Sequence, residues 1–155
     1  EFRRVLFRSD MIFGAATESK LFDTLECKRL ARHFEITTDD GSAGTKGRVS
    51  DLMPDMIKRA DSAVVYACGP MGMLQAVARV SAQHGAISQT AVEESMACGI
   101  GVCMTCVLPV MGEDGITRMV RSCIDGPVFR GDRVRWDAIG TVPADTLGAP
   151  QSGGH

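Results

Sequence analysis

The sequence has little of several features that place proteins in specialised classes. No apolar run approaches the roughly 18 residues that a membrane-spanning helix needs. Basic residues are not in excess, because 17 lysines and arginines stand against 19 aspartates and glutamates. The positive surface typical of nucleic-acid binding is therefore missing. We expect a globular protein of the cytoplasm, with no membrane span and no nucleic-acid partner.

The first nine residues, EFRRVLFRS, resemble a translated sequencing adapter. We expect segment 1–9 to be non-native, with a natural basic arm as the alternative, and we leave it out of the fold prediction. It carries three arginines and one glutamate, so the remainder has 14 basic and 18 acidic residues, a net charge of −4. On this interpretation the protein proper enters in the middle of a domain, near Asp10.

Residues 10–86 alternate strand and helix. The pattern predicts strands at 11–15, 35–38 and 62–68, and helices at 18–34, 50–60 and from Pro70 onward. Such alternation indicates the α/β class, with a parallel sheet covered by helices on both faces. Three strands are few for an open sheet, so we expect a partial nucleotide-binding domain.

The alternation of predicted strands and helices stops after residue 86. A strand is expected in AISQTAVEE, and TCVLPVM and ITRMVRS flank GEDG, which predicts a hairpin. We expect residues 87–140 to form a small β-rich domain, with Trp136 in its core. The composition of residues 141–155 predicts a flexible tail.

Four of the six cysteines lie in this second part. Cys98, Cys103 and Cys106 follow the spacing C-x4-C-x2-C, and Cys123 comes 16 residues later. That is the plant-type ferredoxin pattern for a [2Fe–2S] cluster. Gly99 and Gly101 would let the chain curl around such a group. We expect the apolar neighbours to keep the site dry, namely Met96, Ile100, Val102 and Met104.

Other uses of these cysteines fit the spacing less well. Structural zinc sites usually combine two C-x2-C-like knuckles, whereas here one pair is four residues apart and the last cysteine stands alone. Disulfides need an oxidising compartment, of which the sequence gives no sign. A redox C-x-x-C belongs before a helix, but Cys103-Met-Thr-Cys106 leads into an expected strand. The spacing favours the cluster, and zinc remains the main alternative.

A second candidate site is CGP, residues 68–70. It lies where a predicted parallel strand ends and a helix begins, the position at which open α/β sheets bind ligands. Taken alone, Cys68 is more often a small buried hydrophobic residue, and the functional interpretation depends on its context. The acidic pair Glu93 and Glu94 is expected either at a solvated edge or in positioning the cysteine loop.

Together these motifs resemble a known family. CGP before a helix is similar to the nucleotide domain of the ferredoxin–NADP reductase superfamily. With EESMACGIGVCMTCVLPV and RSCIDGPVF behind it, residues 11–140 resemble the electron-transfer subunits of bacterial dihydroorotate dehydrogenases. The implied fold is a partial parallel-sheet nucleotide-binding domain of ferredoxin reductase type, followed by a small β-rich [2Fe–2S] domain.

The resemblance implies roles for the motif residues. Cys68, Gly69 and Pro70 would lie near the nicotinamide of NAD, and Cys98, Cys103, Cys106 and Cys123 would hold the cluster. The GAATES loop lacks an arginine for a 2′-phosphate, which favours NAD over NADP. The expected partner is an FMN-containing catalytic subunit in a hetero-oligomer that makes orotate for pyrimidine synthesis.

Two parts of the family pattern are absent from the sequence. Neither the FAD-binding barrel nor the first strand of the nucleotide domain, with its glycine-rich turn, is present. FAD is therefore expected only in the full-length protein, and these 155 residues alone are expected to be inactive. The alternatives are an NAD(P)H–ferredoxin reductase or sulfide dehydrogenase subunit, and a non-enzymatic zinc-binding module.

Overall fold

The computed structural model describes residues 9–149, which form two compact units that divide between residues 63 and 64. The adapter-like segment lies outside the described residues, apart from Ser9 at its end. Within the described range, no helix is both long and apolar enough to cross a membrane.

The first unit contains a parallel sheet of order β1-β2-β3, formed by Met11–Ala15, Phe34–Thr38 and Thr45–Lys46. The helix α3, Val49–Ala60, contacts β1. A Cβ atom on Gly14 would lie 2.6 Å from Val49 Cγ1, so glycine permits this close packing. The predicted strands 11–15 and 35–38 and the helix near 50–60 are confirmed.

The helix expected over residues 18–34 is shorter in the structure. It is replaced by the 3-10 turn η1, Glu18–Lys20, and the helix α2, Thr24–Leu30. Asp23 separates them with a left-handed φ of 51°. The apolar residues that suggested one long helix are largely exposed, Leu25 by 84%, so no packing within the described residues extends the helix.

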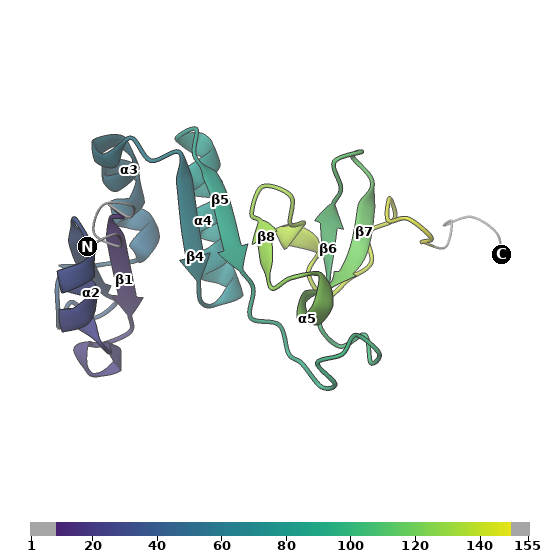
Figure 1. Ribbon diagram of the computed structural model, residues 1–155, viewed down its shortest axis with the longest axis horizontal. Helices are drawn as coiled ribbons and strands as arrows, with labels where there is room; N and C mark the ends of the chain where they lie inside the picture. The colour runs from purple at the N-terminus through teal and green to yellow at the C-terminus, as the bar shows by residue number, and fades with distance from the viewer. Residues whose placement is uncertain (1–8, 150–155) are drawn as a thin grey trace. The chain divides into compact units, whose positions relative to one another are not determined.

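The second unit begins with a mixed sheet of order β4-β5-β8 (Figure 1), made of Val64–Cys68, Ile87–Ala91 and Val128–Arg130. β5 pairs in parallel with β4 and antiparallel with β8. The helix α4, Met71–Gln83, contacts β4 and β5. Its predicted apolar stripe is buried at Leu74, Val77, Ala78 and Val80.

β6, Val107–Met111, and β7, Thr117–Arg121, form the predicted antiparallel hairpin around the GEDG turn. The hairpin shares a core with α4, because Leu74, Val92, Leu108 and Val134 form one buried cluster. β5, which we expected to open a separate domain at residue 87, therefore belongs to the same compact unit as β4. Trp136 packs against this core, as expected.

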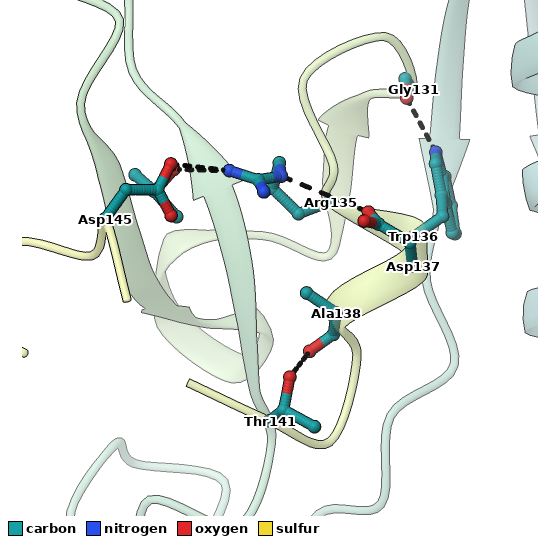
Figure 2. Close-up of polar contacts among 8 residues, drawn as sticks. Gly131, Arg135, Trp136, Asp137, Ala138, Thr141 and Asp145 are labelled. Atoms are coloured by element: carbon teal, nitrogen blue, oxygen red, sulfur yellow. Dashed lines mark hydrogen bonds and ion pairs between the residues drawn. The ribbon is translucent and has the colours of Figure 1, made fainter. Parts of the chain in front are cut away.

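Polar contacts hold the segment after β8 together (Figure 2), and Arg135 Nη1 links it to the hairpin by donating to Thr117 Oγ1 at 3.1 Å. Trp136, in the 3-10 turn η2 (Trp136–Ala138), donates from Nε1 to the Gly131 carbonyl at 2.8 Å. Arg135 forms an ion pair with Asp145 at 2.9 Å. Thr146 is buried and forms an isolated parallel β-bridge with Thr117. Residues 141–149, expected in a flexible tail, are thus tied to β7, whereas residues 150–155 lie outside the described part.

Candidate iron–sulfur site

Three of the four candidate cysteines lie on the loop that joins β5 to β6. This loop reverses direction at three residues with positive φ, namely Gly99 at 67°, Gly101 at 77° and Met104 at 59°. Glycine adopts such angles without a steric penalty. The turns bring Cys98 and Cys103 together, although they are five residues apart.

The fourth cysteine, Cys123, lies on the short helix α5, Ser122–Asp125, directly after β7. The Ser122 N–H donates to the Cys106 carbonyl at 3.0 Å, and Arg121 Nη1 donates to the Gly101 carbonyl at 3.1 Å. A Cβ atom on Gly101 would lie only 1.9 Å from Ile124 Cδ1. Glycine at this position therefore lets α5 approach the cysteine loop closely.

The four thiols are arranged as two pairs. The Cys103 N–H donates to Cys98 Sγ at 3.4 Å, and the two side chains also interact through their sulfur atoms. In the second pair, the interaction between the Cys106 and Cys123 side chains is the main cause that raises the pKa of Cys123. The negative charge of Cys98 contributes to the raised pKa of Cys123, so the first pair lies near the second.

The local hydrogen bonds favour thiolates at two of these positions. A hydrogen bond from the Thr105 hydroxyl, 3.1 Å from Cys103 Sγ, is the main cause that lowers the pKa of Cys103 to about 6. The Cys123 main-chain N–H lowers the pKa of Cys106. The pKa of Cys123 is raised, chiefly by its interaction with the Cys106 side chain. One thiol in each pair therefore favours the thiolate form, which is the form that binds metals.

The donors around the sulfurs suit an iron–sulfur cluster. The Cys103 N–H donates to Cys98 Sγ at 3.4 Å. The main-chain N–H groups of Thr105, Cys123 and Gly101 act to lower the pKa of the other three thiols, Cys103, Cys106 and Cys123 respectively. Such hydrogen bonds compensate the negative charge that cluster sulfurs carry. These thiols therefore fit a group that is ligated entirely by cysteine.

The paired arrangement also distinguishes between metals. Between residues 9 and 149, no three His, Cys, Asp or Glu side chains are grouped closely enough to hold one ion. Structural zinc needs four donors around a single point, whereas a [2Fe–2S] cluster has two thiolates on each of two irons. Two neighbouring thiol pairs fit the second requirement better than the first.

One expectation about the surroundings of the cysteines is wrong. The apolar residues of the loop do not pack over the thiols but face solvent, with Met96 63%, Ile100 70%, Val102 75% and Met104 51% exposed. Only Cys106 is buried among the four cysteines. The loop therefore presents an uncharged apolar surface beside the thiol pairs.

The CGP corner lies at the carboxyl end of β4, as predicted. Cys68 is exposed at the last position of the strand, Gly69 has a φ of 145°, and Pro70 is the N-cap of α4. This positive φ at Gly69, which residues with a side chain rarely adopt, accounts for the glycine, whereas an added Cβ would meet only the flexible end of Met73 at 2.8 Å. Cys68 is thus a surface thiol rather than a core residue.

Next to this corner is a shallow depression of about 250 Å³, lined by Tyr66, Ala67, Cys68, Gln89, Ala91 and Val128. The Cys68 thiol contacts Glu93 Oε1 at 3.8 Å. This contact between Cys68 and Glu93 was not predicted from the sequence. The signal was available, because parallel strands end at the same edge of a sheet and Cys68 pairs with Ala91.

Comparison with known proteins identifies both parts of the chain. The family described as "Iron-sulfur cluster binding domain of dihydroorotate dehydrogenase B" matches residues 93–135, and "Oxidoreductase NAD-binding domain" matches residues 7–79. A dihydroorotate dehydrogenase B (NAD(+)) electron transfer subunit from Caldanaerobacter subterraneus is 40% identical, over 74% of this chain and 49% of that protein. The chain thus carries matches to both domain families and is similar to these electron transfer subunits.

Two further curated relatives have names like that of the Caldanaerobacter protein. The electron transfer subunit from Listeria monocytogenes is 43% identical over 73% of this chain and 43% of that protein. A probable subunit from Methanopyrus kandleri is 32% identical over 96% of this chain and 54% of that protein. The chain thus spans about half the length of the curated relatives it matches.

A solved structure shares the ferredoxin-reductase fold. It comes from work titled "Insights into flavin-based electron bifurcation via the NADH-dependent reduced ferredoxin-NADP oxidoreductase structure". That chain aligns with a TM-score of 0.66 and 31% identity, over 83% of this chain and 44% of its own. The α/β fold class predicted from the sequence is confirmed.

Proposed function

We propose that this chain is the NAD- and cluster-binding part of an electron transfer subunit of dihydroorotate dehydrogenase B. The observation that carries the proposal is the arrangement of four thiols as two neighbouring pairs, on the segment matched by the iron–sulfur domain. In each pair the surroundings lower the pKa of one thiol, Cys103 or Cys106. The six cysteines are all free, which suits a reducing compartment such as the cytoplasm.

In this function Cys98, Cys103, Cys106 and Cys123 would hold a [2Fe–2S] cluster. When bound, the cluster supplies one-electron transfer, and FAD held by the rest of the full-length protein converts between single electrons and the hydride of NADH. The loop and α5 hold the thiols in place, and the main-chain N–H groups stabilise them as thiolates.

The CGP corner is the proposed nicotinamide side of the protein. Cys68, Gly69 and Pro70 stand at the end of β4, beside the depression formed with β5 and β8. Glu93 contacts the Cys68 thiol and lies five residues before the first candidate ligand. One short segment therefore links the proposed NAD site to the cysteine loop. The GAATES loop at the end of β1 contains no arginine, which supports NAD rather than NADP.

The exposed apolar loop is the proposed contact with an FMN-containing catalytic subunit. Residues 95–112 contain no charged side chain, and four apolar residues of the loop face solvent, namely Met96, Ile100, Val102 and Met104. The cores of protein interfaces are depleted in charge, and exposed apolar patches mark interaction sites. A one-electron carrier must lie close to its acceptor, so an interface at this loop suits electron transfer.

The test is turnover by the full-length protein together with the FMN-containing catalytic subunit of the same organism. We expect the two to co-purify and to oxidise dihydroorotate with reduction of NAD. The C106A variant should abolish NAD reduction, whereas the catalytic subunit should still reduce an artificial electron acceptor. Equal NAD reduction with and without the electron transfer subunit would contradict the proposal.

A second candidate function is an NAD(P)H–ferredoxin reductase subunit. It is favoured by the structural relative, whose title names an NADH-dependent reduced ferredoxin-NADP oxidoreductase. The two functions differ in their acceptor. Ferredoxin reduction by the full-length protein, with no response to dihydroorotate when the catalytic subunit is added, would favour the second.

A further inference from the structure

Thr105 places a side-chain hydroxyl on one of the candidate cluster ligands. Its Oγ1 lies 3.1 Å from Cys103 Sγ and is the donor, because a sulfur ligand without its proton can only accept. The Thr105 main-chain N–H also acts to lower the pKa of this thiol. The hydroxyl bond is therefore the direct side-chain contact that Thr105 makes with this sulfur.

The backbone of the loop creates this contact. Met104, between the two residues, has a φ of 59°, which is uncommon outside glycine, asparagine and aspartate. The turn at Met104 brings Thr105 back toward Cys103, although the Thr105 side chain is exposed and water could satisfy its hydroxyl. The conformation thus directs the hydroxyl to the sulfur.

The other hydroxyl beside the thiols differs. Ser122 is buried, and its Oγ has no partner at hydrogen-bonding distance among the described residues. It still lies near enough to Cys106 to contribute to the lowered pKa of that thiol. Thr105 is the hydroxyl for which a bond to a candidate ligand is formed.

We propose that the Thr105 hydroxyl raises the reduction potential of the iron–sulfur cluster by donating a hydrogen bond to the Cys103 sulfur. The inference rests on the proposed function, because it requires the cluster to be bound. Reduction adds one electron and makes the sulfurs more negative, so a donor stabilises the reduced form more than the oxidised form. Thr105 keeps its proton throughout, and no bond is made or broken.

The test compares T105V with T105S in the full-length protein, loaded with iron and sulfide under anaerobic conditions. Valine keeps the branched shape and removes the hydroxyl, whereas serine keeps the hydroxyl. The midpoint potential is measured by a mediated redox titration, followed by visible absorption and by the electron paramagnetic resonance signal of the reduced cluster. The midpoint potential is a property of the molecules that hold a cluster, so it can be measured even for a variant that takes up little iron.

We expect T105V to lower the potential by about 59 mV, equal to a tenfold change in the ratio of reduced to oxidised cluster at fixed potential. T105S should stay close to the wild type. S95A serves as the matched control, because Ser95 is an exposed hydroxyl of the same loop with no bond to a sulfur, and its potential should not change.

A T105V potential equal to that of the wild type would overturn the inference, as would an equal shift in T105S. These results would leave the proposed function intact, because the cluster would be present. A wild-type protein that binds no iron would overturn both.

Discussion

At the scale of single residues, the account depends on glycine and cysteine. Sequence spacing was enough to select the four candidate ligands, because C-x4-C-x2-C is a specific pattern. It could not reveal that the thiols form pairs or that Thr105 bonds to Cys103, since both depend on φ values near Gly101 and Met104. The turn at Gly101 accompanies close packing against Ile124 of α5, a contact that the sequence does not display.

The first prediction concerns Gly101. G101A should lower thermal stability and cluster retention, because its Cβ would meet Ile124 in addition to the cost of positive φ, about 1–2 kcal/mol. G99A is the matched control, since Gly99 also has positive φ but no atom within 4 Å of an added Cβ. Thermal unfolding and iron analysis measure both effects. Equal losses in the two variants would contradict close packing at Gly101.

The second prediction concerns the reactivity of Cys103 in the metal-free protein. Because its pKa is lowered to about 6, this thiol is ionised at pH 7, whereas an unperturbed thiol is mostly protonated. The rate of alkylation by iodoacetamide should rise with pH around a midpoint near 6, and the C103S variant should lose this fast phase. T105V should move the midpoint upward. A midpoint near 9 in the wild type would be inconsistent with the hydrogen bond.

At the scale of elements, the strand and hairpin predictions were accurate and the domain boundary differed. Local patterns predicted β4, α4 and the β6–β7 hairpin, because apolar periodicity and turn residues are encoded locally. They could not predict that β8 pairs with β5, a contact between segments about 40 residues apart. That pairing and the shared core assign β5 and the hairpin to the same compact unit.

The third prediction tests that shared core. Leu108 in β6 is fully buried in one cluster with Leu74 of α4. L108A should cost about 2–5 kcal/mol and should raise the hydrogen-exchange rates of α4 amides as well as those of the hairpin. I116A, at an exposed residue just before β7, is the control and should change neither set. Faster exchange confined to the hairpin would indicate two independent domains.

At the scale of the whole molecule, the chain places a sheet edge with a surface thiol and a cysteine loop within one compact unit. The cysteine loop belongs to a stretch, residues 95–112, that contains no charged side chain. What the loop offers instead is apolar surface, and this surface is the feature suited to a protein partner.

The fourth prediction concerns that surface. V102D places a charge on an apolar residue that is 75% exposed, so it should weaken binding to the catalytic subunit about tenfold or more without loss of iron. V142D, at an exposed valine outside the loop, should bind like the wild type. Titration of the full-length protein with the catalytic subunit measures both. Unchanged affinity for V102D would place the interface elsewhere.

The most direct test of the central claim is the content of iron, acid-labile sulfide and zinc after anaerobic reconstitution of the full-length protein. Two irons and two sulfides per chain are expected. C98A, C103A, C106A and C123A should each lose them, whereas C27A, on α2, should retain them. One zinc per chain without sulfide, or full iron content in any of the four ligand variants, would contradict the account.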